Sequence, residues 1–239
     1  MDTVLKLSGI HKSFKGKKII DGLNMEVNRG EIYGFLGEKG SGKTTTLKMI
    51  MGLLKVDKGN INLLNNEMNN NSREVFRRIG GIIETPVFYE ELSGLMNLKL
   101  HGNLFGGYKQ EKYMELLELV GIRESAKIKV KKYSLEMKQR LGIARALVNN
   151  PDFLIFDELS NELDSKGRRD VINIFKKLSK EGKTILISSH ILGDIEKVCT
   201  KIGIIGRGKI LIEGSVDELL DLNNNADIEE CFLKVIEEE

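Results

Sequence analysis

A glycine-rich stretch near residue 40 is the part of the sequence whose residue types and spacing indicate chemistry most directly. It reads Gly37-Glu38-Lys39-Gly40-Ser41-Gly42-Lys43-Thr44 and fits the phosphate-loop pattern G-x-x-x-x-G-K-[ST]. Its glycines let the backbone curl so that successive N–H groups point into one concavity and bind phosphate oxygens. We expect Lys43 to reach the terminal phosphates and the Thr44 hydroxyl to hold Mg²⁺.

The segments on either side of the loop are the ones that such a site requires. Ile32 to Leu36 is a short apolar run typical of a buried strand, and a helix is expected from Thr44 to about Leu54. The positive N-terminal end of that helix would face the bound phosphates. This order of strand, loop and helix favours a phosphate site over a glycine turn beside an exposed lysine.

Two adjacent carboxylates follow another apolar run, Phe153 to Phe156. Ligands of α/β sheets bind beyond the carboxyl ends of the strands, so Asp157 is expected where Mg²⁺ needs a carboxylate. Glu158 is expected one residue further on, as a general base that polarises an attacking water. His190 follows a further apolar strand, Thr184 to Ser188, and is expected at the same edge near the γ-phosphate.

Composition narrows the class of protein. The chain has 239 residues with 37 basic and 35 acidic side chains, and its net charge of +2 gives no argument for binding nucleic acid. Cys199 and Cys231 are expected to be reduced thiols rather than part of a disulfide or metal framework. The sequence shows no apolar run of 18 residues and no signal peptide, so we expect any membrane-spanning part to belong to another subunit.

The order of the elements predicts an α/β fold. Short strands with glycine turns are expected over the first 35 residues, and helical patterns dominate from about Leu92 to Asn149. Apolar strands alternate with helices from Asp152 onward, which argues for a largely parallel sheet covered on both faces. We predict one domain over 1–239, with a core of 1–84 and 151–222, a helical subdomain of 85–150, and a C-terminal helix or tail of 223–239.

Taken together, the chain resembles ATP-binding cassette (ABC) proteins, specifically the nucleotide-binding subunit of a transporter, from Leu5 to about Leu233. The resemblance implies a P-loop NTPase (RecA-like) parallel-sheet core with an N-terminal antiparallel β subdomain and an inserted α-helical subdomain. The matching positions are Phe14 (stacking on adenine), Gly37 to Thr44 with the following Thr45 (ATP), Ser134 to Leu141 (the signature motif), Asp157 (Mg²⁺), Glu158 (catalytic base), Asn161 to Asp164 (the loop that crosses the dimer interface) and His190 (the switch histidine).

In this family two subunits dimerise head to tail, and each ATP lies between the phosphate loop of one and the signature motif of the other. Ser134, Glu136 and Asp164 would therefore meet the ATP of the second subunit. The resemblance implies ATP and Mg²⁺ as cofactors and an integral membrane permease as partner, with no nucleic acid. It also implies a cytoplasmic location, peripheral on the inner face of the cell membrane.

Several positions depart from the usual pattern of the family. Glu84 stands where most members have the Gln that is expected near Mg²⁺ and the attacking water, and a Glu there resembles the branch linked to bacitracin and lantibiotic self-protection. Glu136 stands where that branch usually has Gly. A carboxylate about 5 Å from a phosphate charge costs roughly 3 kcal/mol at an effective dielectric of about 20, unless Glu136 points outward to solvent. Glu162 would add another carboxylate at the dimer interface.

Three functions follow from these observations. The first is an ABC-type ATPase that hydrolyses Mg-ATP to power a transporter, exporting peptide antibiotics or similar compounds. The alternative is a degenerate ATP-binding module with weak or no hydrolysis, because of Glu136 and Glu162, that acts as the regulatory half of a heterodimer. A soluble ABC protein of DNA repair or translation is disfavoured, because the chain has one cassette, no long heptad insertion and no basic face. Both homodimers and heterodimers stay open.

Overall fold

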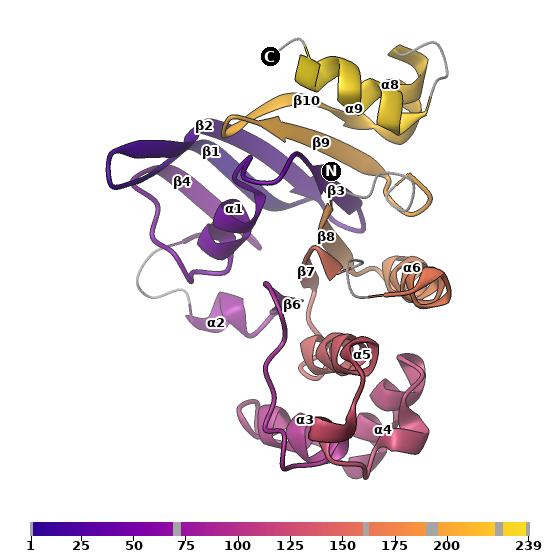
Figure 1. Ribbon diagram of the computed structural model, residues 1–239. Helices are drawn as coiled ribbons and strands as arrows, with labels where there is room; N and C mark the ends of the chain where they lie inside the picture. Colours follow the sequence, from indigo (N-terminus) through magenta and orange to yellow (C-terminus); the bar gives the residue numbers. More distant parts are fainter. Residues whose placement is uncertain (1, 69–72, 160–162, 190–195, 223–226, 238–239) are drawn as a thin grey trace.

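The computed structural model describes residues 2–68, 73–159, 163–189, 196–222 and 227–237, and Figure 1 shows how their elements are arranged. A four-stranded sheet has the order β2-β1-β4-β5, and a six-stranded sheet has the order β10-β9-β3-β8-β7-β6. Helices α3, α4 and α5 form a separate helical part at the bottom of the view. Among the described residues, the helices are too short or too polar to cross a bilayer.

The N-terminal sheet is antiparallel and has longer strands than the sequence predicts. Its main strands, β1 (Thr3–Phe14) and β2 (Lys17–Asn28), each have 12 residues, and β4 (Lys58–Leu63) and β5 (Asn66–Glu67) continue the sheet. Shifts of register, such as the one between Leu7 and Ile10, break the alternation of side chains without ending the strand. A bulge of this kind places two residues opposite one, so the sequence pattern resembles several short strands.

The second sheet is largely parallel, which confirms the predicted fold class. Its parallel strands are β3 (Ile32–Leu36), β6 (Ile79–Ile82), β7 (Phe153–Asp157), β8 (Thr184–Ser189) and β9 (Lys201–Gly206). The edge strand β10 (Lys209–Ser215) runs antiparallel to β9 and forms a hairpin with it. The carboxyl ends of β3 and β7 therefore lie at the same edge of the sheet, where ligands of α/β folds bind.

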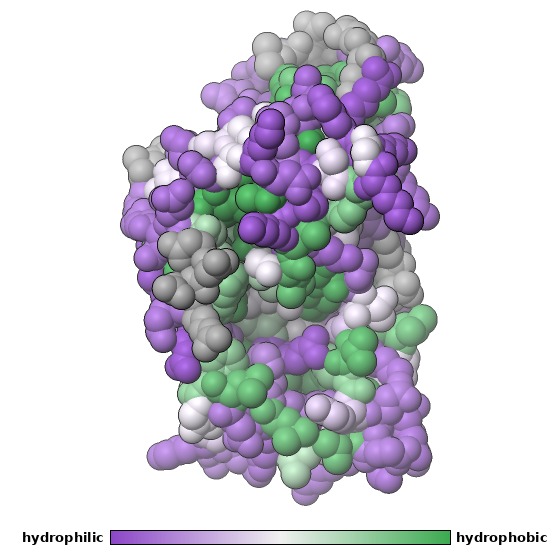
Figure 2. All heavy atoms as spheres, turned by 90° about the vertical axis from the view of Figure 1, so that its left-hand side faces the viewer, coloured by the Kyte–Doolittle hydropathy of each residue, from purple (hydrophilic) through white to green (hydrophobic). Residues whose placement is uncertain are grey.

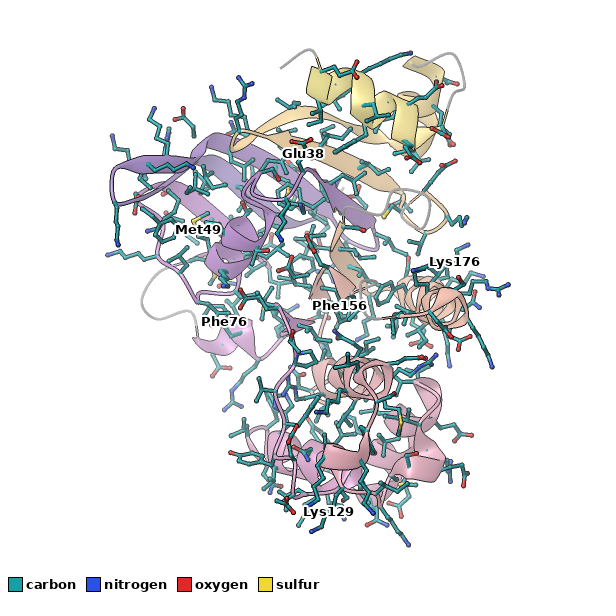
Figure 3. The ribbon with its side chains drawn as sticks, viewed as in Figure 1. Glu38, Met49, Phe76, Lys129, Phe156 and Lys176 are labelled. Carbon is teal, nitrogen blue, oxygen red and sulfur yellow. The ribbon has the colours of Figure 1, made fainter. Side chains whose placement is uncertain are left out.

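Both faces of the parallel sheet are covered, and β7 shows this residue by residue. Phe153 and Ile155 belong to a core shared with the N-terminal sheet and α1 (Lys43–Ile50). Leu154 and Phe156 belong to a second core shared with the helices on the other face. The alternation follows from the two-residue period of a strand. Figure 3 shows Phe156 near the middle of the molecule, and its ring stacks on that of Phe175 with centroids 4.9 Å apart.

The remaining helices surround these cores. α1 ends at Ile50 rather than near Leu54, because Gly52 adopts a left-handed backbone with a φ of 68°. The helices beyond α1 are α2 (Arg73–Phe76), α3 (Gly94–Asn103), α4 (Gln110–Leu119), α5 (Leu135–Ala146), α6 (Ser165–Lys180), α8 (Val216–Leu222) and α9 (Ile228–Glu237).

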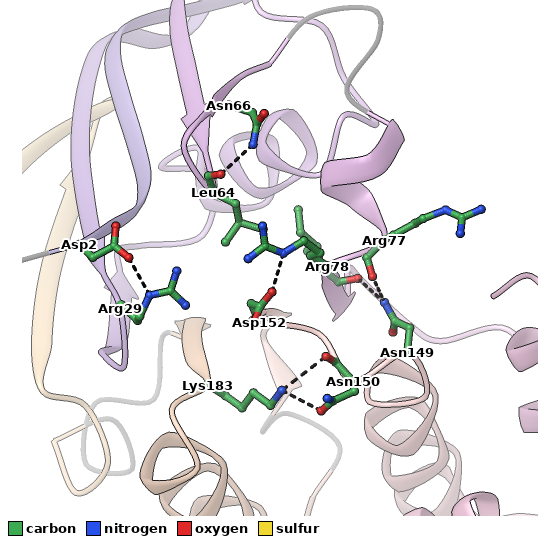
Figure 4. Close-up of polar contacts among 11 residues, drawn as sticks. Asp2, Arg29, Leu64, Asn66, Arg77, Arg78, Asn149, Asn150, Asp152 and Lys183 are labelled. Atoms are coloured by element: carbon green, nitrogen blue, oxygen red, sulfur yellow. Dashed lines mark hydrogen bonds and ion pairs between the residues drawn. The ribbon is translucent and has the colours of Figure 1, made fainter. Parts of the chain in front are cut away.

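Polar contacts join the segments that precede β6, β7 and β8 (Figure 4). The Arg78 guanidinium pairs with Asp152 at 2.6 Å, which joins the segment before β6 to the segment before β7. The Asn149 amide donates to the Arg77 carbonyl at 2.6 Å, just after α5. These contacts hold α5 against β6, so that the helical part has a defined position relative to the sheet.

Candidate nucleotide-binding site

The predicted phosphate loop joins β3 to α1 at the carboxyl edge of the parallel sheet. Gly42 precedes α1 with a φ of 110°, and a Cβ at this position would lie only 2.4 Å from Ile20 Cδ1. A Cβ on Gly37 would lie 2.5 Å from the Ile205 carbonyl oxygen. Both positions therefore require glycine, the first for backbone conformation and space and the second for space alone.

The side chain of Lys43 folds back into the loop. Its ammonium donates to the carbonyl oxygens of Gly37 at 2.7 Å and Glu38 at 3.0 Å, and it lies 3.8 Å from Glu158 Oε1. Burial lowers the pKa of Lys43, while the carboxylates of Glu158 and Asp157 act in the opposite direction. A cation held by neutral carbonyls in this way can exchange them for phosphate oxygens, which are stronger acceptors.

The two adjacent carboxylates lie at the end of β7, at the same edge as the loop. Asp157 is buried and accepts a hydrogen bond from the Ser188 hydroxyl on β8, the residue paired with it in the sheet. Glu158 is half-buried with a left-handed φ of 47°, and its N–H donates to the Ser188 carbonyl at 3.1 Å. The backbone therefore turns sharply after Asp157 and separates the directions of the two side chains.

A cavity of about 490 Å³ brings most of the predicted site together. It is lined by ten residues singled out from the sequence: Phe14, Lys39, Gly40, Gly42, Lys43, Thr44, Thr45, Glu84, Asp157 and Glu158. Ile19, Thr85 and Gln139 complete the lining. Among the other predicted residues, Gly37, Glu38 and Ser41 belong to the loop but are not part of the lining, whereas His190 and Glu162 lie outside the described residues.

The segment after β6 carries Glu84 to the rim of this cavity. Glu84 has a left-handed φ of 62° and an exposed side chain, and its Oε1 lies 2.8 Å from the ammonium of Lys48 on α1. No local pattern in the sequence indicates this partner. Lys48 lies on the helix that follows the phosphate loop, and only the fold brings it to residue 84. An exposed pair of this kind contributes at most about 1 kcal/mol, but it orients the carboxylate.

Gln139 on α5 is a further residue whose place in the cavity the sequence did not reveal. It is buried, and its Oε1 has no hydrogen-bond partner among the described residues. Leaving a buried carbonyl oxygen without a donor costs about 1–3 kcal/mol, so the site can gain from a ligand or water that donates to it. The sequence carried no clear signal for its burial, because Gln139 stands between Lys138 and Arg140 in a polar stretch of the helix.

The residues predicted to meet the ATP of a second subunit lie outside this cavity, at the beginnings of two helices. Ser134 caps α5, and its hydroxyl accepts from the Met137 N–H at 3.1 Å. Asp164 caps α6, and its carboxylate accepts from the Gly167 N–H at 2.7 Å, a bond that lowers the pKa of Asp164. Both caps are exposed.

Glu136 forms an ion pair that the sequence expectations did not include. Its Oε1 accepts from Arg140 Nε at 2.8 Å, one turn along α5, and its side chain is 32% exposed. The carboxylate is therefore ion-paired and only partly exposed to solvent. The pattern did contain the necessary signal, because a Glu four residues before an Arg on a helix is well placed to pair with it.

Comparison with known proteins agrees with this geometry. A model of the ABC transporter family matches residues 20–161. The chain is 43% identical to the bacitracin transport ATP-binding protein BcrA of Bacillus licheniformis, over 93% of this chain and 73% of that protein. It is 39% identical to the lantibiotic transport ATP-binding protein SrtF of Streptococcus pyogenes, over 93% of this chain and 96% of that protein.

Solved structures give the same result. The ATP-binding subunit of an ABC transporter superposes with a TM-score of 0.88 at 26% identity, covering 98% of this chain and 99% of the other. A dimeric ATP-binding cassette in a post-hydrolysis state with ADP and Pi bound superposes with a TM-score of 0.81 at 26% identity, covering 89% of this chain and 98% of the other. The family and the fold predicted from the sequence are confirmed: this chain belongs to the ABC transporter family, as an ATP-binding cassette.

Proposed function

We propose that the chain binds Mg-ATP in the 490 Å³ cavity and hydrolyses it as a head-to-tail dimer that powers a transporter. The observation that carries this proposal is the convergence of Lys43, Asp157 and Glu158 from two segments on one cavity, with Lys43 3.8 Å from Glu158. A cation for the phosphates and a carboxylate for the attacking water are the groups that ATP hydrolysis requires.

The residues present also fit Mg²⁺. Thr44 offers a hydroxyl and Asp157 a carboxylate on the same cavity, and Glu84 adds a second carboxylate at its rim. Mg²⁺ prefers such oxygen ligands and keeps most of its shell from water and phosphates. When bound, the ion would neutralise charge on the β- and γ-phosphates.

The other residues would divide the work of binding and catalysis. Phe14 would stack on adenine at the open end of the cavity, where its ring is exposed. Lys43 would leave the carbonyls of Gly37 and Glu38 for the phosphates. Glu158 would accept a proton from the attacking water, since its carboxylate lines the cavity beside Asp157. His190 and Glu84 would be further catalytic residues.

An apolar hollow in the helical part fits the predicted permease partner. It has a volume of about 560 Å³ and is lined by side chains of α3, of the segment after Glu84 and of Arg145 on α5. Val87, Tyr89 and Leu104 are 80%, 69% and 70% exposed. Figure 2 shows apolar side chains gathered on this lower part of the molecule. Phe88 also lines the hollow, and its ring packs against the core under the Arg145 guanidinium, 4.7 Å from the ring centroid.

We infer that docking on a permease places the chain on the inner face of the cell membrane. The relatives support a class of substrate, since BcrA is a bacitracin transport ATP-binding protein and SrtF a lantibiotic transport ATP-binding protein. We therefore propose that the transporter handles peptide antibiotics or similar compounds. The pairing of Glu136 with Arg140 supports hydrolysis over the degenerate alternative, because it reduces the charge that would oppose the phosphates.

Steady-state ATP hydrolysis tests the proposal, measured on the purified chain alone and together with a candidate permease in lipid nanodiscs. Turnover is expected in both, with more in the presence of the permease, and Glu158→Gln serves as the inactive reference. Binding of Mg-ATP without turnover above that reference, even with a permease that forms a stable complex, would favour the regulatory module instead.

A further inference from the structure

The first turns of α5 and α6 lie against each other. A Cβ on Gly167, in the first turn of α6, would be 3.0 Å from Glu136 Oε1 in the first turn of α5. The same position would be 3.4 Å from Asp164 Oδ1. The absence of a side chain at Gly167 therefore lets the carboxylate of one helix approach the N-cap of the other.

Arg140 joins the two helices at this contact. Its Nε donates to Glu136 at 2.8 Å, its Nη2 donates to Asp170 on α6 at 2.9 Å, and its Nη1 donates to the Val120 carbonyl at 3.0 Å. The side chain is only 10% exposed. Burial disfavours its charge, but the hydrogen bonds to Asp170 and Glu136 outweigh burial and raise the pKa of Arg140. One guanidinium thus binds both helices and the end of α4.

The two N-caps next to this contact are the residues expected to reach the second subunit. Ser134 precedes Glu136 by two residues, and Asp164 precedes Gly167 by three. The field of Arg140 also reaches Asp164, where it adds to the effect of the Gly167 N–H in lowering the pKa of that carboxyl. A change in the contacts of Arg140 would therefore move or loosen both caps together.

We propose that Glu136, Arg140 and Asp170 form a clasp that fixes Ser134 and Asp164 relative to each other, so that both can meet the ATP of a second subunit. Glu136 is then a positioning residue that acts through Arg140. This inference rests on the proposed function, because it assigns the clasp a purpose only in a dimer held together by ATP.

The clasp explains how a carboxylate can stand where a glycine is usual. Arg140 compensates the charge of Glu136, and the positive N-terminal ends of two helices lie beside it. Removing Glu136 would leave the guanidinium with Asp170 and the Val120 carbonyl, in a place with little access to water. Substitution by glycine should therefore loosen the arrangement rather than improve the approach to phosphate.

The test compares Mg-ATP-dependent dimerisation by sedimentation in a Glu158→Gln parent that retains ATP. Glu136→Gln, Glu136→Gly and Asp170→Asn are each expected to raise the dimer dissociation constant by about ten- to one-hundred-fold, the range that follows from losing one charged hydrogen bond. The double variant Glu136→Gln with Asp170→Asn should lose less than the product of the two single effects, because both partners act through Arg140. Asp170→Glu, which keeps the charge, should recover part of the loss.

The same helix provides a matched control. Lys138 on α5 pairs with Glu90 at 2.7 Å, and Glu90 lies in the helical part rather than on α6. Glu90→Gln should leave the dimer constant unchanged. Asp170→Asn should not alter the ATP affinity of the monomer. Hydrogen exchange of the monomer gives an independent readout: the Met137 and Gly167 amides should exchange faster in Asp170→Asn and not in Glu90→Gln.

The possible results distinguish a failure of the clasp from a failure of the proposed function. Variants that bind ATP, dimerise like the parent and keep the exchange rates of the parent would overturn the clasp and leave the proposed function standing. Tighter dimers in Glu136→Gly would also overturn it, since they would show that the carboxylate opposes the phosphates. A parent that binds no ATP or never dimerises would overturn the proposed function, and the assigned purpose of the clasp with it.

Discussion

The ammonium of Lys43 lies 3.8 Å from the carboxylate of Glu158, across the cavity floor between α1 and the end of β7. The same ammonium is bound by two carbonyls of its own loop. The lysine predicted to hold phosphate and the carboxylate predicted to activate water are thus close neighbours. Phosphates that draw Lys43 toward themselves would change the charge beside Glu158.

Lys43→Ala should weaken Mg-ATP binding by about ten- to one-hundred-fold, because a charged hydrogen bond to phosphate is lost. Titration with a fluorescent ATP analogue measures this. The variant should unfold at a temperature close to that of the wild type, since the cation it removes is disfavoured by burial. Identical titration curves for the two proteins would remove Lys43 from the site.

Glu158→Gln should lower turnover by a factor on the order of 10² to 10⁴ and keep ATP binding, because an amide cannot accept the proton of the attacking water. Single-turnover hydrolysis together with an ATP-binding assay separates the two effects. Full activity in this variant would mean that another group is the base.

The Lys48–Glu84 pair should compete with Mg²⁺ for the Glu84 carboxylate. Lys48→Met is expected to lower the Mg²⁺ concentration needed for half-maximal ATP binding by a few-fold at low salt, and added salt should shrink the difference, because the pair is exposed and screened. Lys6→Met removes an exposed pair with Glu26 on the N-terminal sheet, away from the cavity, and is the control. An equal Mg²⁺ midpoint in Lys48→Met and in the control would show that Glu84 does not approach the ion.

Stability at alkaline pH should depend on Tyr33. Burial, reinforced by hydrogen bonding to Glu213, raises the pKa of Tyr33 well above its ordinary value. A raised pKa in the folded state means that this stabilisation is fully present below the unfolded pKa of about 10 and is lost progressively as pH rises from there toward the higher pKa of the folded state. Urea unfolding from pH 8 to 11 should show a steeper loss in the wild type than in Tyr33→Phe. Parallel losses would exclude this tyrosine as the cause.

The sequence predicted the parallel sheet and the residues that line the cavity of this subunit, because both depend on local patterns. Apolar runs such as Phe153 to Phe156 end in polar residues, and the carboxyl ends of parallel strands meet at one edge, so Asp157 could be placed near the phosphate loop from sequence alone. Gly37 and Gly42 could be recognised because few backbones other than a phosphate loop need glycine at that spacing.

The contacts missed from the sequence join segments far apart in the chain. Lys48 and Glu84 are separated by 36 residues and Arg140 and Asp170 by 30, so no local period connects them. β1 and β2 are longer than the sequence predicts, because shifts of register interrupt the alternation of buried and exposed side chains. The sequence suggested only a phosphate or solvent as surroundings for the Glu136 carboxylate. In the fold this carboxylate also has Arg140 and the first turn of α6 beside it.

The central claim is that each ATP lies between Lys43 of one subunit and Ser134 of the other, and mixing two defective subunits tests it most directly. Lys43→Ala removes the phosphate cation, and Ser134→Asp keeps a good cap for α5 while placing a negative charge toward the phosphate. Both are made in the Glu158→Gln parent and checked for folding.

Neither variant should dimerise alone with Mg-ATP, because both sites of each homodimer are defective. In a head-to-tail mixture the two defects fall into one site and the other site is intact, so sedimentation should show mixed dimers that retain one ATP. If the parent dimerises and the mixture stays as monomeric as its components, ATP is not shared between subunits in this way and the account is contradicted.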